Sequence, residues 1–229
     1  MINYCIIPAR KNSKRIKNKN FKKFCGKPII QWPIEEILKS KKFDKIFIYT
    51  DDSKIKKKFL KYKNINIIER SIKCASDFTP ILSSIRSCIK KIKKKYKEPH
   101  NICYVLPTAV LLRSKYLIKS YNDFLKSRKN FCFSVTNYSY PVQRSFILKK
   151  KKISFLMKKY RLKRSQDIEK VYHDAGLFYW GKTNAFLNQI EMFSKETLPY
   201  KISNHKTIDI DNHDDWKNAI IKFKYYKKL

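Results

Sequence analysis

A basic loop near the N-terminus is the first segment whose residue types could do chemistry. Residues 8–15 read Pro-Ala-Arg-Lys-Asn-Ser-Lys-Arg, and Lys19 and Asn20 follow shortly afterwards. Arginine and lysine neutralise phosphate charge, and main-chain N–H groups and the Ser13 hydroxyl can donate to phosphate oxygens. The spaced glycines and the Gly-Lys-Ser/Thr ending of a Walker A loop are absent. The loop suits a triphosphate, although on composition alone a merely solvated basic loop is the stronger alternative.

Two aspartates, Asp209 and Asp211, flank Ile210 late in the chain. If residues 207–211 form a strand, alternation places both carboxylates on one face, about 7 Å apart. Paired carboxylates at a strand end suit Mg²⁺, which prefers oxygen ligands and also binds phosphates. The alternative is an acidic strand end that caps the next helix. Asp214 and Asp215 are better placed for that helix N-terminus, where negative charge is favoured.

A third cluster combines Arg164-Ser165-Gln166-Asp167 with His173-Asp174-Ala175-Gly176. Charged and amide side chains of this kind can bind a carboxylate and other polar groups of a ligand, and the forked arginine donors match a carboxylate. His173 is open to a second interpretation, as a core or surface histidine. The aromatic residues that follow, 178–180, are expected to pack inside a buried strand rather than stack on a ligand.

Alternating strand and helix patterns must position these groups. Short apolar runs predict strands at residues 3–7, 45–50, 65–68, 102–106 and 131–135. Apolar residues at helical spacing predict helices at 28–40 and 80–96, and a further helix capped by Asn212. Pro28 fits a first helical turn, whereas Pro33 is expected to shorten or kink its helix. The alternation indicates an α/β fold with a mostly parallel sheet.

Residues 138–172 interrupt this rhythm with short apolar pieces around a lysine run, which indicates a hairpin-like excursion. We find no internal repeat and no flexible linker. The 229 residues are therefore interpreted as a single domain from which the excursion protrudes.

The net charge of +36, from 54 Lys+Arg against 18 Asp+Glu, is the most unusual property of the composition. Such a charge is typical of nucleic-acid-binding proteins. However, the lysines lack interleaved aromatic residues and no known binding motif is present, so specific nucleic-acid binding is not expected. The six cysteines lack zinc spacing and are expected to be core fillers. With no signal peptide pattern and no run of about 18 apolar residues, no membrane association and a cytoplasmic location are expected.

Motifs along nearly the whole chain resemble the CMP-sugar synthetases of sialic acid type. The opening motif is Ile-Pro-Ala-Arg-x-x-Ser-Lys-Arg-Ile-x-x-Lys-Asn at residues 7–20, and a mid-chain proline–threonine loop occupies residues 106–109. Further matches are Phe24-Cys25-Gly26-Lys27-Pro28 and Thr50-Asp51-Asp52. The segments 133–136, 140–144, 164–167 and 173–180 look like the branch that acts on pseudaminic acid.

The resemblance implies a Rossmann-like, GT-A-like nucleotidyltransferase that transfers CMP from CTP to the anomeric hydroxyl of a nonulosonic acid. It implies pseudaminic acid as the acceptor, with N-acetylneuraminic, legionaminic or Kdo-type acids as alternatives. It also implies Mg²⁺ on Asp209 and Asp211, and a homodimer built through residues 138–172. Arg10, Lys19 and the two aspartates would be catalytic.

The remaining assignments fall into two groups. Nucleotide binding is assigned to Ala9, Arg10, Ser13, Lys14, Lys19, Asn20, Arg70, Thr79, Pro107 and Thr108. Sugar binding is assigned to Gln143, Arg144, Arg164, Ser165, Gln166, His173, Asp174 and Gly176.

Three departures from the family pattern affect these expectations. Lys11 and Asn12 replace glycines, and Asn12 is expected to take the left-handed backbone that glycine would adopt. Val110 replaces a proline. Leu177 replaces a glutamine and is expected to remove a polar contact to the sugar.

Overall fold

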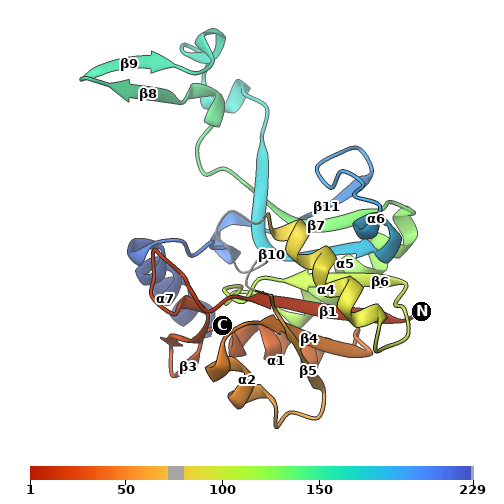
Figure 1. Ribbon diagram of the computed structural model, residues 1–229. Coiled ribbons are helices and arrows are strands. Elements are labelled where there is room, and N and C mark those ends of the chain that lie inside the picture. The colour runs from red at the N-terminus through yellow and green to blue at the C-terminus, as the bar shows by residue number, and fades with distance from the viewer. Residues whose placement is uncertain (72–79, 228–229) are drawn as a thin grey trace.

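A seven-stranded sheet forms the centre of the computed structural model, which describes residues 1–71 and 80–227 (Figure 1). Its strand order is β11-β7-β10-β6-β1-β4-β5. The strands are β1 (Asn3–Ala9), β4 (Lys45–Thr50), β5 (Ile65–Glu69), β6 (Asn101–Val105), β7 (Phe131–Asn137), β10 (Tyr172–Lys182) and β11 (Thr197–Lys201). Only β10 runs antiparallel to its neighbours β6 and β7; the other pairings are parallel. The predicted mostly parallel α/β sheet is therefore confirmed.

Helices cover both faces of this sheet. They are α1 (Gln31–Ser40), α2 (Ser53–Phe59), α4 (Ile81–Lys93), α5 (Ser114–Ser127), α6 (Thr183–Leu187) and α7 (His213–Lys227). Cys5 and Ile7 of β1 belong to a core cluster with α1, α2 and α5, whereas Tyr4 and Ile6 belong to a second cluster with α4 and α6. Successive strand residues point to opposite faces, so β1 is buried on both sides, as its unbroken apolar run predicted.

Proline placement differs from expectation at the first helix. Pro28 lies in β3 (Lys27–Pro28), which pairs with β2 (Lys23–Phe24), and α1 begins only at Gln31. Pro33 is consequently in the first turn of α1, where its missing N–H has no intrahelical acceptor to lose. The helix is shorter than the predicted range 28–40 because it starts only at Gln31, and at this place Pro33 interrupts none of its hydrogen bonds.

The C-terminal helix α7 begins as predicted, but the segment before it does not. The Asn212 side chain accepts hydrogen bonds from the N–H groups of Asp214 and Asp215. Asp215 in turn accepts from the N–H groups of Asp211 and Asn212, which completes a reciprocal cap. Residues 207–211 have no strand pairing, so the predicted strand there was wrong; this segment follows a 3₁₀ turn (Asn204–Lys206) and crosses toward the basic loop.

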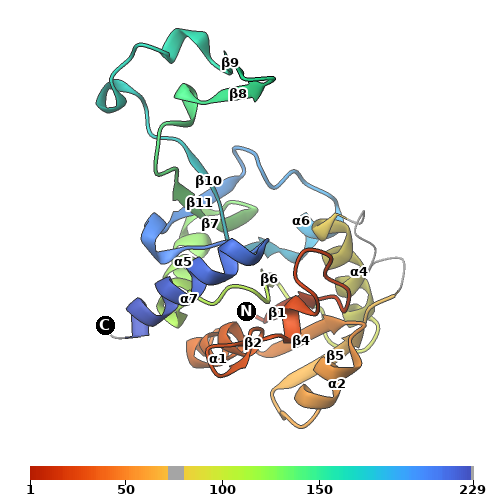
Figure 2. The ribbon, with the colours of Figure 1, turned by 90° about the vertical axis from the view of Figure 1, so that its left-hand side faces the viewer.

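The excursion at residues 138–172 projects far from the body in two perpendicular views (Figures 1 and 2). Its hairpin pairs β8 (Phe146–Lys149) with β9 (Lys152–Phe155), confirming the predicted hairpin. Lys150 and Lys151 both have positive φ, as the type I′ turn of a two-residue hairpin requires. Three short 3₁₀ turns complete the excursion, at Val142–Arg144, Lys158–Tyr160 and Ser165–Asp167.

The described cysteines are free thiols, and most of them are buried. Cys5, Cys88, Cys103 and Cys132 are free and buried, as expected of core fillers, and burial raises the pKa of Cys132 to about 12. Cys25 is free and half-buried, and Cys74 lies outside the described residues.

None of the helices in the described part of the chain combines the length and the apolar character that a membrane span needs.

Candidate active site

A cavity of about 330 Å³ opens where β1 and β6 end. Strand order reverses between these two neighbours, and open α/β sheets bind ligands at such a switch point. Most of the predicted nucleotide and metal residues line this cavity: Arg10, Ser13, Lys14, Lys19, Asn20, Arg70, Pro107, Thr108, Asp209 and Asp211. Residues up to 201 positions apart in the chain therefore meet at one site.

The basic loop is held in shape by side chains that were assigned to ligand binding or left without a role. The buried Asn20 amide donates to the main-chain oxygen of Arg10 at 2.9 Å. Asp51 accepts from the N–H of Lys11 at 2.9 Å. Left-handed backbone occurs at Asn18, with a φ of 54°, and not at Asn12, so the expectation for Asn12 was wrong. The turn that needs this conformation lies immediately before the 3₁₀ turn Lys19–Phe21.

The Thr50-Asp51-Asp52 segment, which resembles a family motif, has a structural role. Asp52 is almost fully buried and caps α2 by accepting from the N–H of Lys54 at 2.8 Å. The Thr50 hydroxyl accepts from the N–H of Asp52 at 3.0 Å. Together with Asp51, these residues secure the end of β4 and the loop that borders the cavity.

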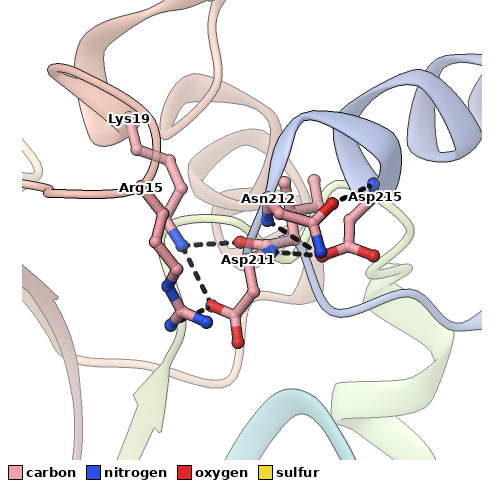
Figure 3. A network of polar contacts seen from close by, with 6 residues as sticks. Arg15, Lys19, Asp211, Asn212 and Asp215 are labelled. Atoms are coloured by element: carbon pink, nitrogen blue, oxygen red, sulfur yellow. Dashed lines mark hydrogen bonds and ion pairs between the residues drawn. The ribbon is translucent and has the colours of Figure 1, made fainter.

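Asp211 stands at the centre of a polar network that joins the first loop to the last segment (Figure 3). Its Oδ1 atom lies 2.9 Å from Nη2 of Arg15 and 3.5 Å from Nζ of Lys19. Lys19 also donates to the main-chain oxygen of Ile210 at 2.5 Å. The buried Ile210 side chain packs with Ile16 of the loop, so apolar contact supports the polar one. Arg15 was not assigned to the site, although it belongs to the same basic loop.

Asp209 also lines the cavity, and its surroundings disfavour the ionised form. Partial removal from water raises the pKa of its carboxyl group above the usual range, and the negative charge of Asp211 raises it further. The Lys19 ammonium opposes this effect. A cation that binds between the two aspartates would relieve the same repulsion.

The donor set formed by Asp209 and Asp211 fits Mg²⁺. Both are hard oxygen ligands in one cavity, and Mg²⁺ commonly uses one or two carboxylates together with waters and phosphate oxygens. Within residues 1–71 and 80–227, no group of three or more histidine, cysteine or acidic side chains could enclose a metal by itself. The arrangement therefore suits an ion that arrives with a phosphate ligand.

The loop after β6 supplies the opposite wall. Pro107 and Thr108 line the cavity, and Leu106, which was not assigned, lines it too. Val110 is 2% exposed and packs in the cluster that holds Ile16 and α7, so an apolar contact stands where the family has proline. Ala9 is fully buried in the core and does not line the cavity, whereas its neighbour Pro8 does. Thr79 lies outside the described residues.

The predicted sugar residues on the excursion do not reach the cavity of their own chain. Ser165 and Gln166 line a separate hollow of about 430 Å³ at the base of the excursion. Exposed Arg164 pairs with Asp167 at 2.8 Å, and Arg144 is exposed. Gln143 is buried and donates to the main-chain oxygen of Glu169 at 2.8 Å. Within one chain, the structure brings none of these residues next to Asp209.

The His173–Gly176 segment is divided between two environments. The His173 ring lies against Tyr138, with ring centroids 4.5 Å apart, and does not line the cavity. Asp174 accepts from the N–H of Gly176 and from the hydroxyl of Tyr179. Gly176 has a φ of +65° and lies beside Asp209. The predicted sugar contacts of these three residues stay predictions.

The position of Leu177 contradicts the expectation that this residue faces the sugar. Its side chain is fully buried in the core cluster that contains α1, α2 and α5, and it does not line the cavity. The expectation that a residue at this position faces the sugar was wrong for this chain, because a bulge in β10 turns the side chain inward. The aromatic residues Phe178, Tyr179 and Trp180 are buried, as predicted.

Comparison with known proteins agrees with this geometry. A family model described as cytidylyltransferase matches residues 4–229. The pseudaminic acid cytidylyltransferase of Campylobacter jejuni is 34% identical over 225 residues, which cover 98% of this chain and 97% of that protein. An N-acylneuraminate cytidylyltransferase of Streptococcus agalactiae is 24% identical and covers 94% of this chain and 52% of its own.

A solved structure shows the same fold at low sequence identity. The CMP:2-keto-3-deoxy-manno-octonic acid synthetase, determined in complex with CTP, aligns over the whole of both chains with a TM-score of 0.73 and 12% identity. At that identity the likeness concerns the fold alone. It matches the predicted nucleotidyltransferase architecture.

Proposed function

Because this chain belongs to the cytidylyltransferase family, we propose that it transfers CMP from CTP to the anomeric hydroxyl of pseudaminic acid and releases pyrophosphate. The observation that carries the proposal is the cavity that gathers basic side chains, Asp209 and Asp211 at the ends of β1 and β6. Identity of 33–34% over 98% of the chain to pseudaminic acid cytidylyltransferases supports the acceptor. A cytoplasmic location is part of the proposal, since CTP is a cytoplasmic metabolite.

The chain's own residues would act by positioning and charge neutralisation. Arg10, Ser13 and Lys14 would hold the triphosphate in the loop after β1. Lys19 already faces Asp211 and would balance charge at the α-phosphate. The acceptor hydroxyl loses its proton to solvent as its oxygen forms a bond to the α-phosphorus, and the bond to the leaving pyrophosphate breaks. Pro107 and Thr108 stand on the opposite wall and would contribute to cytosine selection.

A magnesium ion is proposed as the cofactor, held by Asp209 and Asp211. When bound, it would supply charge neutralisation to the phosphates and stabilise charge that develops during transfer. Arg15 would give up its contact with Asp211 to the ion and turn toward the phosphates.

A homodimer is proposed to complete the sugar site. The excursion exposes large apolar side chains, among them Tyr140 at 84%, Leu148 at 68% and Leu162 at 85%. Exposed apolar groups on a two-stranded hairpin, which has little stability alone, mark an interaction surface. Because Arg144, Arg164, Ser165 and Gln166 lie on this arm, away from their own cavity, the arm of one copy would present them to the cavity of the other.

The direct test is pyrophosphate release from CTP with a panel of purified nonulosonic acids. Pseudaminic acid should be used with the highest kcat/KM, ahead of N-acetylneuraminic, legionaminic and Kdo-type acids. A preference for N-acetylneuraminic acid would reject the assigned acceptor and leave the reaction standing. No release with any acid would reject the transferase, and a parallel salt titration of DNA binding would then examine the +36 charge.

A further inference from the structure

A bulge in β10 lies directly beside the cavity. Asp174 pairs with Val135 of β7 and Tyr179 pairs with Phe133, so β10 advances five positions while β7 advances two. The surplus residues are secured by Ser134, whose buried hydroxyl accepts from the N–H groups of Leu177 and Phe178. The bulge is therefore a built feature of the strand and not a frayed end.

The Asp174 carboxylate connects the two ends of this bulge. Its Oδ1 atom accepts from the N–H of Gly176 at 2.8 Å, and its Oδ2 atom accepts from the Tyr179 hydroxyl at 2.6 Å. Tyr179 is 4% exposed and stacks on Tyr104, with ring centroids 4.2 Å apart. Tyrosine has few rotatable bonds, and stacking on the rings of Tyr104 and Phe133 fixes the hydroxyl in place.

The tip of the bulge lies next to Asp209. A Cβ atom built on Gly176 would make ordinary van der Waals contact with Cγ of Asp209 at 3.6 Å and with Cδ1 of Leu106 at 3.7 Å, so the glycine leaves a space of about one methyl group beside the Asp209 side chain. The main-chain oxygen of Leu177 accepts from the N–H of Leu106 at 3.2 Å and joins the bulge to the cavity wall. The position of Gly176 thus bounds the space in which the Asp209 carboxylate stands.

We propose that Tyr179 and Asp174 are positioning residues that hold Gly176 beside Asp209 and so set the space that this carboxylate has in the cavity. The inference rests on the proposed role of Asp209 as a metal ligand. It gives Asp174 a task different from sugar binding, because both of its oxygens already accept hydrogen bonds from the bulge. Tyr179 and Asp174 do not line the cavity, and besides holding Gly176 the Asp174 carboxylate adds negative charge near Asp209.

Tyr179→Phe removes one hydroxyl and keeps the ring, and Tyr104→Phe is its matched control. Both rings are buried in the same stack, but the Tyr104 hydroxyl faces the sulfur of Met192 at 3.9 Å and not Asp174. Mn²⁺ would be titrated into nucleotide-free protein and the free ion followed by electron paramagnetic resonance. Tyr179→Phe should weaken Mn²⁺ binding roughly 10-fold, as loss of groups that orient metal ligands does. Tyr104→Phe should leave it unchanged.

Kinetics and a second pair of variants separate positioning from general destabilisation. At saturating Mg²⁺, Tyr179→Phe should lower kcat and leave KM for CTP unchanged. Asp174→Asn keeps a hydrogen-bonding group at both ends of the bulge and should bind Mn²⁺ more tightly than Asp174→Ala, which loses the charge and both hydrogen bonds. This pair also decides the matter if Tyr179→Phe fails to fold.

Two outcomes would overturn the inference while the proposed function stands. One is Mn²⁺ binding by Tyr179→Phe and Asp174→Ala equal to that of the active native protein. The other is a rise in KM for the sugar in both Asp174 variants without a change in Mn²⁺ binding, which would make Asp174 a sugar ligand. Native protein that neither binds Mn²⁺ nor releases pyrophosphate would instead reject the proposed function itself.

Discussion

The Nζ atom of Lys19 lies 2.5 Å from the main-chain oxygen of Ile210, and this contact ties the loop after β1 to the segment before α7. The same ammonium is 3.5 Å from the Asp211 carboxylate, which Arg15 also approaches. Opposite charges from the two ends of the chain are therefore held on one side of the cavity. Substitutions at either end of this link should affect the same catalytic step.

Asp211→Asn should lower turnover by orders of magnitude while the fold survives. The amide keeps the size of the side chain but loses the charge that a divalent cation needs, and removing a metal ligand costs far more than removing a surface charge. Turnover with CTP and pseudaminic acid would be measured across a range of Mg²⁺ concentrations. Asp214→Asn is the matched control, since its side chain is 85% exposed in the first turn of α7. Near-normal turnover with unchanged Mg²⁺ dependence would contradict the metal assignment.

Arg10→Ala should impair the use of CTP far more than the use of the sugar. The guanidinium lines the cavity in the loop that is expected to hold the triphosphate, and a charged hydrogen bond is worth about 1.5–3 kcal/mol, or roughly 10- to 150-fold in KM for CTP. Initial rates at varied CTP and fixed sugar would measure this. Lys63→Ala removes one positive charge at an exposed position outside the cavity and should have no effect. An unchanged KM for CTP together with unchanged turnover would remove Arg10 from the site.

Mixing two inactive variants should restore activity if each excursion serves the other copy. Asp211→Asn leaves the excursion intact, and Arg164→Ala leaves the cavity intact. A heterodimer of the two would contain one complete site, built from the native cavity of one chain and the native arm of its partner. Pyrophosphate release would be measured before and after subunit exchange. If the excursion acts on its own cavity, the mixture would remain as inactive as its parts.

Leu177→Gln should destabilise the protein. The family pattern alone indicates the opposite result, because the family has glutamine at this position. The side chain is fully buried in the core, and burial of an amide without hydrogen-bond partners costs about 1–3 kcal/mol. Urea unfolding would measure the loss, with Leu60→Gln as the control because Leu60 is 74% exposed. A variant of native stability with improved use of pseudaminic acid would show that position 177 can reach the sugar after all.

Local patterns in the sequence were sufficient for five of the seven strands of the sheet and for the chemistry of the loops, but they missed β11 and predicted a strand at 207–211 that the structure lacks. The apolar run at Lys45–Thr50 predicts β4 with its observed bounds, because a strand buried on both faces has no polar residue to interrupt it. The Asn212 cap and the basic loop with Lys19 can also be predicted from the sequence, because capping and phosphate binding depend on residue types within a few positions. The family resemblance added the pairing of that loop with Asp209 and Asp211.

Only the tertiary structure decided which way individual side chains face and what they touch. Leu177 turns into the core and Gly176 onto Asp209 because β10 carries a bulge whose register depends on β7, more than 30 positions earlier in the chain. Pro33 does not disrupt α1 because the helix starts at Gln31. The small two-stranded ladder of β2 and β3 that precedes it cannot be predicted from a helical pattern. The excursion, which carries Arg164, projects away from the body (Figures 1 and 2), and Arg164 does not line the cavity. Chain geometry, and not residue type, decides the distance between two such segments.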